Sequence, residues 1–150
     1  LRWWKNLEKI IFTQKNKTVL VSDVMMGLDR VPVINEFVIL KEALEEMGRT
    51  RLGIVCIAND ENKLLGIMTD GDIRRKLLKV QKPFSAFYVD DALDHAIRSP
   101  MVIKPGATLF DAVDVMEQKQ IWDLPVVDEK GLLVGLLHLH PVVQSLLENK

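Results

Sequence analysis

Apolar residues recur along this chain with two different spacings, and the two spacings alternate in a fixed order. Between residues 39 and 47 they return every three or four positions, which predicts an amphipathic helix. A short β-rich run at 31–34 precedes this helix, and two compact apolar runs follow it at 53–58 and 64–69. These runs predict strands, and the Asn-Asp-Glu-Asn sequence at 59–62 predicts a hairpin turn between the last two.

The same order of elements recurs 69 residues further along the chain, and each copy ends in a predicted helix, at 72–79 and at 141–148. A gap-free shift of 69 places seven identical residues opposite one another over positions 31–72, where ordinary residue usage gives about two or three. The identical pairs are Val33 with Val102, Ile34 with Ile103, Leu40 with Leu109, Ala43 with Ala112, Met47 with Met116, Leu64 with Leu133 and Gly66 with Gly135.

The sequence therefore predicts an α/β (α+β) fold built from tandem β-α-β-β-α repeats. A unit of about 50–55 residues buries too little apolar surface to be stable alone, so we expect the repeats to pack face to face about a pseudo-twofold axis. Such packing leaves a cleft between the two copies. The predicted division is a lead-in or linker helix at 1–21, a first repeat at 22–80, a connector at 81–98 and a second repeat at 99–150.

Composition narrows the classes of protein that this chain can be. Twenty Lys and Arg residues against 21 Asp and Glu residues give a net charge of −1, which disfavours binding to nucleic acid. The longest apolar stretch, 52–58, is far shorter than a membrane span, so no membrane partner is expected. Cys56 has no partner cysteine, which predicts a reducing, cytoplasmic location. Because the chain begins with Leu1, we expect it to be processed or cut from a longer protein.

The segment from Gly66 to Arg75 joins the end of a predicted strand to the start of a predicted helix. The first N–H groups of a helix are unpaired and carry partial positive charge, so they attract anions. Gly71 allows close approach to the backbone, and the Arg74 and Arg75 side chains, expected near the first turn, favour phosphate. These features predict an anion site at the start of this helix.

Two side chains in the same segment match the rest of a nucleotide. Thr69 can donate its hydroxyl, and the Asp72 carboxylate can accept hydrogen bonds from both hydroxyls of a ribose. A plainer interpretation is that Asp70 and Asp72 neutralise the neighbouring arginines on a solvated helix face. A third is that the two aspartates bind magnesium in a glycosyl or phosphoryl transferase.

The tandem repeat and the run Gly66-Ile67-Met68-Thr69-Asp70-Gly71-Asp72 resemble the CBS domain pair, or Bateman module, over roughly residues 22–148. Within that family the chain is most similar to the regulatory tail of arabinose 5-phosphate isomerases of the lipopolysaccharide pathway, with CBS pairs of sugar nucleotidyltransferases second. The resemblance implies a nucleotide bound in the cleft, regulation of a fused or partner enzyme domain, and self-association as a homodimer or larger assembly. It also implies that Thr69 and Asp72 contact phosphate and ribose.

The second copy departs from this pattern, because His138 replaces the threonine and Pro141 replaces the aspartate. We therefore expect two unequal sites, with the nucleotide held mainly through the first. His138 and His140 alternate along a predicted strand and should face the same side, where polar contacts are expected rather than a metal. Base contacts are expected from apolar residues, namely Val33, Ile34, Leu52, Ile103, Ile121, Leu124 and Pro125.

Three functions follow from these observations. The first is a non-catalytic regulatory module that needs no cofactor and senses AMP, ADP, ATP or a CMP-sugar. The second is a structural dimerisation module whose cleft stays empty. The third is a small metal-dependent enzyme that uses Asp70, Asp72, His138 and His140.

Overall fold

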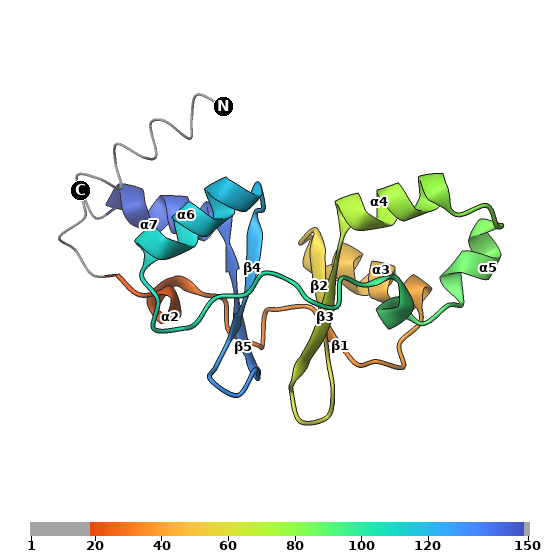
Figure 1. The fold of residues 1–150 in the computed structure, drawn as a ribbon, viewed down its shortest axis with the longest axis horizontal. Helices are drawn as coiled ribbons and strands as arrows, with labels where there is room; N and C mark the ends of the chain where they lie inside the picture. Colours follow the sequence, from red (N-terminus) through yellow and green to blue (C-terminus); the bar gives the residue numbers. More distant parts are fainter. Residues whose placement is uncertain (1–18, 149–150) are drawn as a thin grey trace.

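The computed structural model describes residues 19–148, so most of the predicted lead-in helix at 1–21 lies outside the described residues. Two halves lie side by side, each with a small sheet and two main helices (Figure 1). The first half contains β1 (Val33–Ile34), α3 (Leu40–Thr50), β2 (Ile54–Ala58), β3 (Leu64–Thr69) and α4 (Asp70–Lys79). The second contains α6 (Leu109–Lys119), β4 (Asp123–Val127), β5 (Leu133–His138) and α7 (Leu139–Glu148). Short helical segments complete the chain, namely α2 (Val21–Val24), α5 (Phe84–Tyr88) and the 3-10 turn η1 (Ala92–His95).

The strands form two sheets, one in each half. In the first half β1 pairs parallel with β2, and β2 pairs antiparallel with β3. In the second half β4 pairs antiparallel with β5. Helices and small sheets thus build an α+β fold, which confirms the predicted fold class.

The repeat also predicts a short β-rich run at 101–103, the counterpart of the run at 31–34, and in the structure it is reduced to a single parallel bridge between Ile103 and Val126. The reason lies in one residue of the repeat. In the first half the amide of Cys56 donates to the carbonyl of Pro32 at 2.9 Å. Pro125 stands at the position of Cys56 in the second half and has no N–H group, so the corresponding hydrogen bond cannot form.

A segment of chain from outside each half completes that half. Residues 19–26 pack on the second half, where Val21 donates to the Ala107 carbonyl at 2.8 Å and belongs to its core. Residues 90–97 pack on the first half in the same way, with Ala92 donating to Val38 at 2.9 Å and buried in that core. The matching contacts show that the two halves are related by an approximate twofold axis.

Each of these segments also bridges to a sheet. Ile97 and Ile67 exchange two backbone hydrogen bonds of 2.8 and 3.0 Å, and so do Met26 and Leu136. Gly66 and Gly135 come directly before Ile67 and Leu136, and each lies against one of these two crossing segments, 90–97 and 19–26. Because glycine has no Cβ, each segment can pass close to the strand at this point.

The sheets pack against each other, and their hairpin tips are joined. The apolar residues between the sheets come from both halves, and they are Val31, Ile54, Cys56, Ile67, Leu133 and Leu136. At the tips, the Asn62 amide side chain donates to the Leu133 carbonyl at 2.6 Å, and Lys63 bridges Leu132. Both predicted hairpin turns are confirmed. Among the described residues no helix is long and apolar enough to cross a membrane.

Candidate functional site

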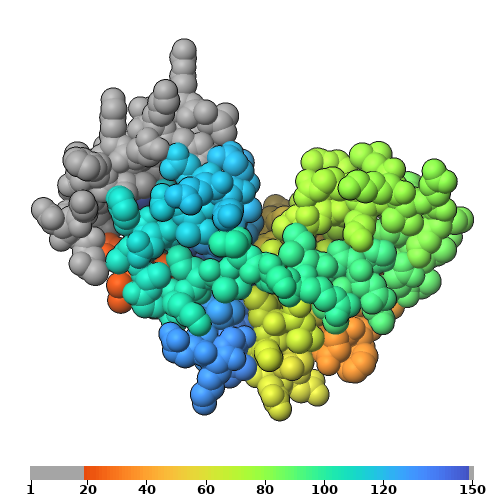
Figure 2. Space-filling model, in the orientation of Figure 1, coloured from red at the N-terminus to blue at the C-terminus, as the bar shows by residue number. Residues whose placement is uncertain are grey.

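A cleft of about 970 Å³ opens where the two halves meet, at the end opposite the hairpin tips. One wall is formed by the end of β3 and the first turns of α4, and the other by residues 119–123 between α6 and β4. Ile97 and residues 99–101, which continue the segment at 90–97 toward the second half, line the cleft between these walls. Figure 2 shows the hollow between the blue-to-cyan part of the second half and the lime-green α4 of the first. Its size is that of a site for a small molecule.

On the first wall, Thr69 and Asp72 bind each other around the start of α4. The Asp72 amide donates to Thr69 Oγ1 at 3.2 Å, and the Thr69 amide donates to Asp72 Oδ2 at 3.2 Å. This reciprocal pair is a capping box, which satisfies two otherwise unpaired N–H groups of the helix terminus. Thr69 Oγ1 also donates to Asp72 Oδ2 at 2.7 Å. Both polar side chains are therefore held at the cleft by the local sequence alone.

The same carboxylate is paired with Arg75, whose Nη2 donates to Asp72 Oδ1 at 2.6 Å. Asp72 thus accepts three hydrogen bonds, while a carboxylate can accept about four, so capacity remains on Oδ1. Arg74 also lines the cleft, and within residues 19–148 no ion pair is found for its guanidinium. Because α4 begins at Asp70 rather than at the predicted Asp72, both arginines lie at the start of its second turn, just past the first turn near which they were expected.

The opposite wall carries a tryptophan and an aspartate, and the aspartate is paired with a histidine. His138 Nδ1 lies 2.7 Å from Asp123 Oδ1, and this hydrogen bond raises the pKa of His138 above its ordinary value. Asp123, Ile121 and Trp122 line the cleft, and Lys119 at the end of α6 joins them. Of these four wall residues the sequence predicts only Ile121, and His138 contacts Asp123 without itself lining the cleft. The signal for the other three is their position, because residues 119–123 join a helix to a strand in the second copy as residues 50–54 do in the first.

Seven of the predicted site residues line this cleft, and they are Thr69, Asp70, Gly71, Asp72, Arg74, Arg75 and Ile121. The others lie elsewhere. Val33 and Ile34 are half-buried in β1. Ile103 and Leu124 belong to the core of the second half, and Pro125 is buried in β4, so none of the three lines the cleft.

His140 is exposed in the first turn of α7, which begins at Leu139 directly after β5 ends at His138. It therefore does not share a strand face with His138, and that prediction was wrong. Within residues 19–148 no three His, Cys, Asp or Glu side chains are grouped so that they could hold a metal ion.

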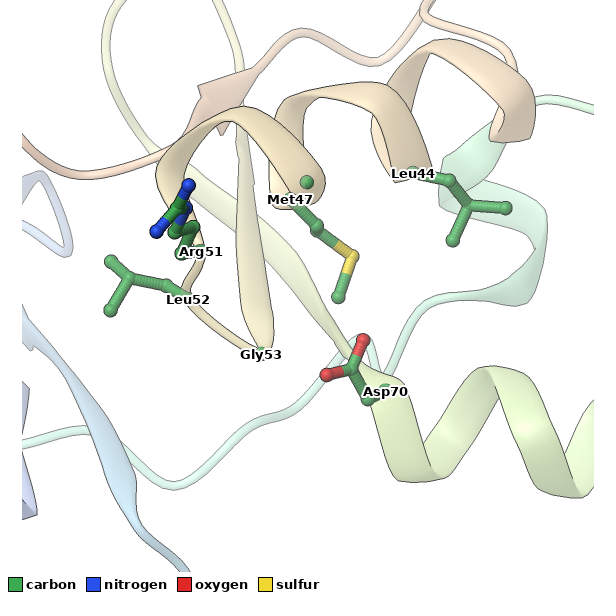
Figure 3. Close-up of a pocket in the computed structure, with 7 residues that line it drawn as sticks. Leu44, Met47, Arg51, Leu52, Gly53 and Asp70 are labelled. Carbon is green, nitrogen blue, oxygen red and sulfur yellow. The ribbon is translucent and has the colours of Figure 1, made fainter.

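A smaller cavity of about 270 Å³ adjoins the cleft and shares Gly53 and Asp70 with it. Figure 3 shows Met47 extending from α3 toward the Asp70 carboxylate, and Leu44 lines the same cavity from the preceding turn of that helix. Leu52, another predicted site residue, lies at the edge of this cavity. A Cβ added to Gly53 would lie 2.9 Å from Asp70 Oδ2, so the glycine is required for the carboxylate to lie between the two spaces.

A scan of protein families matches the model for the CBS domain twice, at residues 21–79 and 89–143. Arabinose 5-phosphate isomerase KdsD of Salmonella typhi is 32% identical over 125 residues, which are 83% of this chain and 37% of the relative. An uncharacterized protein of Helicobacter pylori is 33% identical over 132 residues, 87% of this chain and 38% of the relative. The chain thus spans less than two-fifths of the length of these relatives.

Solved structures show the same fold. CBSX2, a CBS-pair protein from Arabidopsis thaliana, was crystallised in complex with AMP. It superposes with a TM-score of 0.77 at 27% identity, and the match covers 87% of this chain and 97% of CBSX2.

Proposed function

The chain belongs to the CBS domain family, and from this premise we propose that it is a regulatory module that binds a nucleotide in the cleft between its two halves. The observation that carries the proposal is the cleft itself, with the Thr69–Asp72 capping box at its wall. A free lone pair on Asp72 Oδ1 accepts from a ribose hydroxyl, and Arg74 receives the phosphate. The crystallised complex of CBSX2 with AMP supports a ligand of this chemical class.

The position of the cleft supports a regulatory role. Its walls come from different halves, so a bound ligand contacts both. A ligand shifts a conformational equilibrium only by its differential affinity for the two arrangements. A molecule that touches α4 and residues 119–123 together distinguishes a closed from an open arrangement, and this difference is transmitted to whatever domain is attached.

The attached domain that we propose is a sugar-phosphate isomerase. The support is the 32% identity to KdsD of Salmonella typhi, of which this chain spans only 37%. We propose further that the protein acts in lipopolysaccharide precursor synthesis in the cytoplasm, and the free, buried Cys56 thiol supports a reducing compartment. Self-association of the module is part of the same proposal.

The isomerase proposal is tested by measuring aldose–ketose isomerisation by the longer protein with and without nucleotide. The present chain alone is expected to show no turnover.

The test of ligand binding is a panel of AMP, ADP, ATP, CMP and a CMP-sugar, screened by thermal shift and then measured by calorimetry. Asp72→Ala should weaken binding about 10- to 100-fold, since a hydrogen bond to a charged group contributes about 1.5–3 kcal/mol. The matched control is Asp111→Ala, which removes the same capping-box carboxylate from α6, away from the cleft. It should cost similar stability and leave binding unchanged.

Two results would contradict the proposal. One is the absence of binding by any nucleotide in the panel to a folded chain; a stable dimer in light scattering would then favour the structural dimerisation module. The other is equal loss of binding in Asp72→Ala and Asp111→Ala, which would make the effect one of stability rather than contact.

A further inference from the structure

The two halves differ sharply at one position of the repeat, and the difference lies in the cleft. Trp122 corresponds to Gly53, as their backbones show: the Leu139 amide donates to the Trp122 carbonyl at 2.9 Å, and the Asp70 amide donates to the Gly53 carbonyl at 3.1 Å. Gly53 has no side chain and lies under the Asp70 carboxylate. Trp122 carries the largest side chain available, lines the cleft and remains 61% exposed.

The backbone around Trp122 is fixed on both sides. Gln120 ends α6 in the left-handed conformation with φ of 54°, and the Ile121 amide donates to the Met116 carbonyl at 3.1 Å. The carbonyl of Trp122 itself is held by α7. The indole is nevertheless absent from the buried core clusters of residues 19–148. An aromatic ring on a rigid backbone, exposed in a cleft, is suited to contact a ligand rather than to stabilise the fold.

The charges around the ring point to the rest of that ligand. Two of the cleft carboxylates have partners, because Asp72 is bound by Arg75 and Asp123 by His138. Arg74 and Lys119 line the same cleft from opposite walls, and within the described part of the chain neither forms an ion pair. A planar ring for stacking combined with two available cations matches a heterocyclic base joined to a phosphate.

We propose that Trp122 is the base-stacking platform of the cleft, and that the ligand is a nucleoside phosphate whose phosphate lies toward Arg74 and Lys119. This inference rests on the proposed function and adds the orientation of the ligand. The base lies against the second half and the ribose against Asp72 of the first. The same ring explains why the two copies are unequal, because the position of Gly53 offers no surface on which a base could stack.

The experiment compares a nucleotide with a phosphate sugar that has no base. AMP and ribose 5-phosphate are titrated into the chain and into Trp122→Leu and Trp122→Phe by calorimetry. Stacking of one base on an aromatic side chain corresponds to about a 5- to 150-fold change in affinity, so Trp122→Leu should weaken AMP by that factor. Trp122→Phe should retain most of the affinity, and ribose 5-phosphate should bind equally to all three proteins. In a Trp3→Phe, Trp4→Phe background, AMP should also quench the remaining tryptophan fluorescence.

The outcomes separate this inference from the proposed function. If Trp122→Leu binds AMP as the wild type does while Asp72→Ala loses it, the stacking platform is overturned and the nucleotide site stands. If Trp122→Leu weakens AMP and ribose 5-phosphate equally, the ring is a wall of the cleft and not a base platform. If the wild-type chain binds no nucleotide, the proposed function fails and the inference fails with it.

Discussion

Replacing Gly66 or Gly135 by alanine tests the exchange of segments between the two halves. A Cβ at Gly66 would lie 2.8 Å from the carbonyl oxygen of Ile97, and one at Gly135 would lie 2.7 Å from that of Met26. Side-chain carbons do not approach a backbone oxygen so closely, and backbone cannot rotate away as a flexible side chain does. The crossing segment must therefore shift in each variant.

The expected cost follows from what that shift breaks. Each segment is held at this point by two backbone hydrogen bonds of 2.8 and 3.0 Å, to Ile67 in the first half and to Leu136 in the second. A hydrogen bond contributes about 1 kcal/mol net, and overpacking a filled site costs about 1–3 kcal/mol. Each variant should lose about 2–3 kcal/mol, which lowers the melting temperature of a domain of this size by roughly 4–12 °C.

Urea denaturation measures the free energy of unfolding, and hydrogen exchange at Ile67 and Ile97 locates the loss. Gly48→Ala is the matched control, because it makes the same change in the exposed part of α3 with no atom within 4 Å. It should stabilise the protein by about 0.5–1 kcal/mol through helix propensity. If Gly66→Ala and Gly135→Ala both unfold within about 0.5 kcal/mol of the wild type, the crossing segments do not pack where the structure places them.

Three further predictions concern single groups. Thr108→Ala removes the side-chain cap of α6 and should lower the free energy of unfolding in urea by about 1 kcal/mol without affecting ligand binding; an unchanged midpoint would show that the cap contributes nothing. Asp123→Asn should lower the pKa of His138 in an NMR titration. Because folding raises this pKa, the stabilising contribution is present at low pH and lost as the pH rises through the folded-state pKa; identical titrations would disprove the pairing. Burial raises the pKa of the Cys56 thiol to about 12, so a thiol reagent at pH 8 should label it only after unfolding, and rapid labelling of the native chain would contradict its burial.

The local features of the site could be predicted from the sequence because they depend on neighbours in the chain. Thr69 and Asp72 stand three residues apart at a strand–helix junction. Such a pair forms a capping box when the first residue is the N-cap of the helix, as Thr69 is here. The opposite wall could not be predicted in this way. Trp122 and Asp123 carry no motif of their own, and only the packing of the halves brings them into the cleft with Thr69.

The amino-acid sequence by itself determined the repeat, the order of its helices and strands, the hairpin turns and the resulting fold class. These depend on hydrophobic periodicity and on short-range turn and cap chemistry, which act over a few residues. The tertiary structure decided which half each connecting segment completes. Residues 19–26 complete the second half and residues 90–97 the first, because a bridge to a strand edge depends on which edges are unpaired in three dimensions. That exchange joins the halves on either side of the cleft, and so makes a shared site from two copies of one pattern.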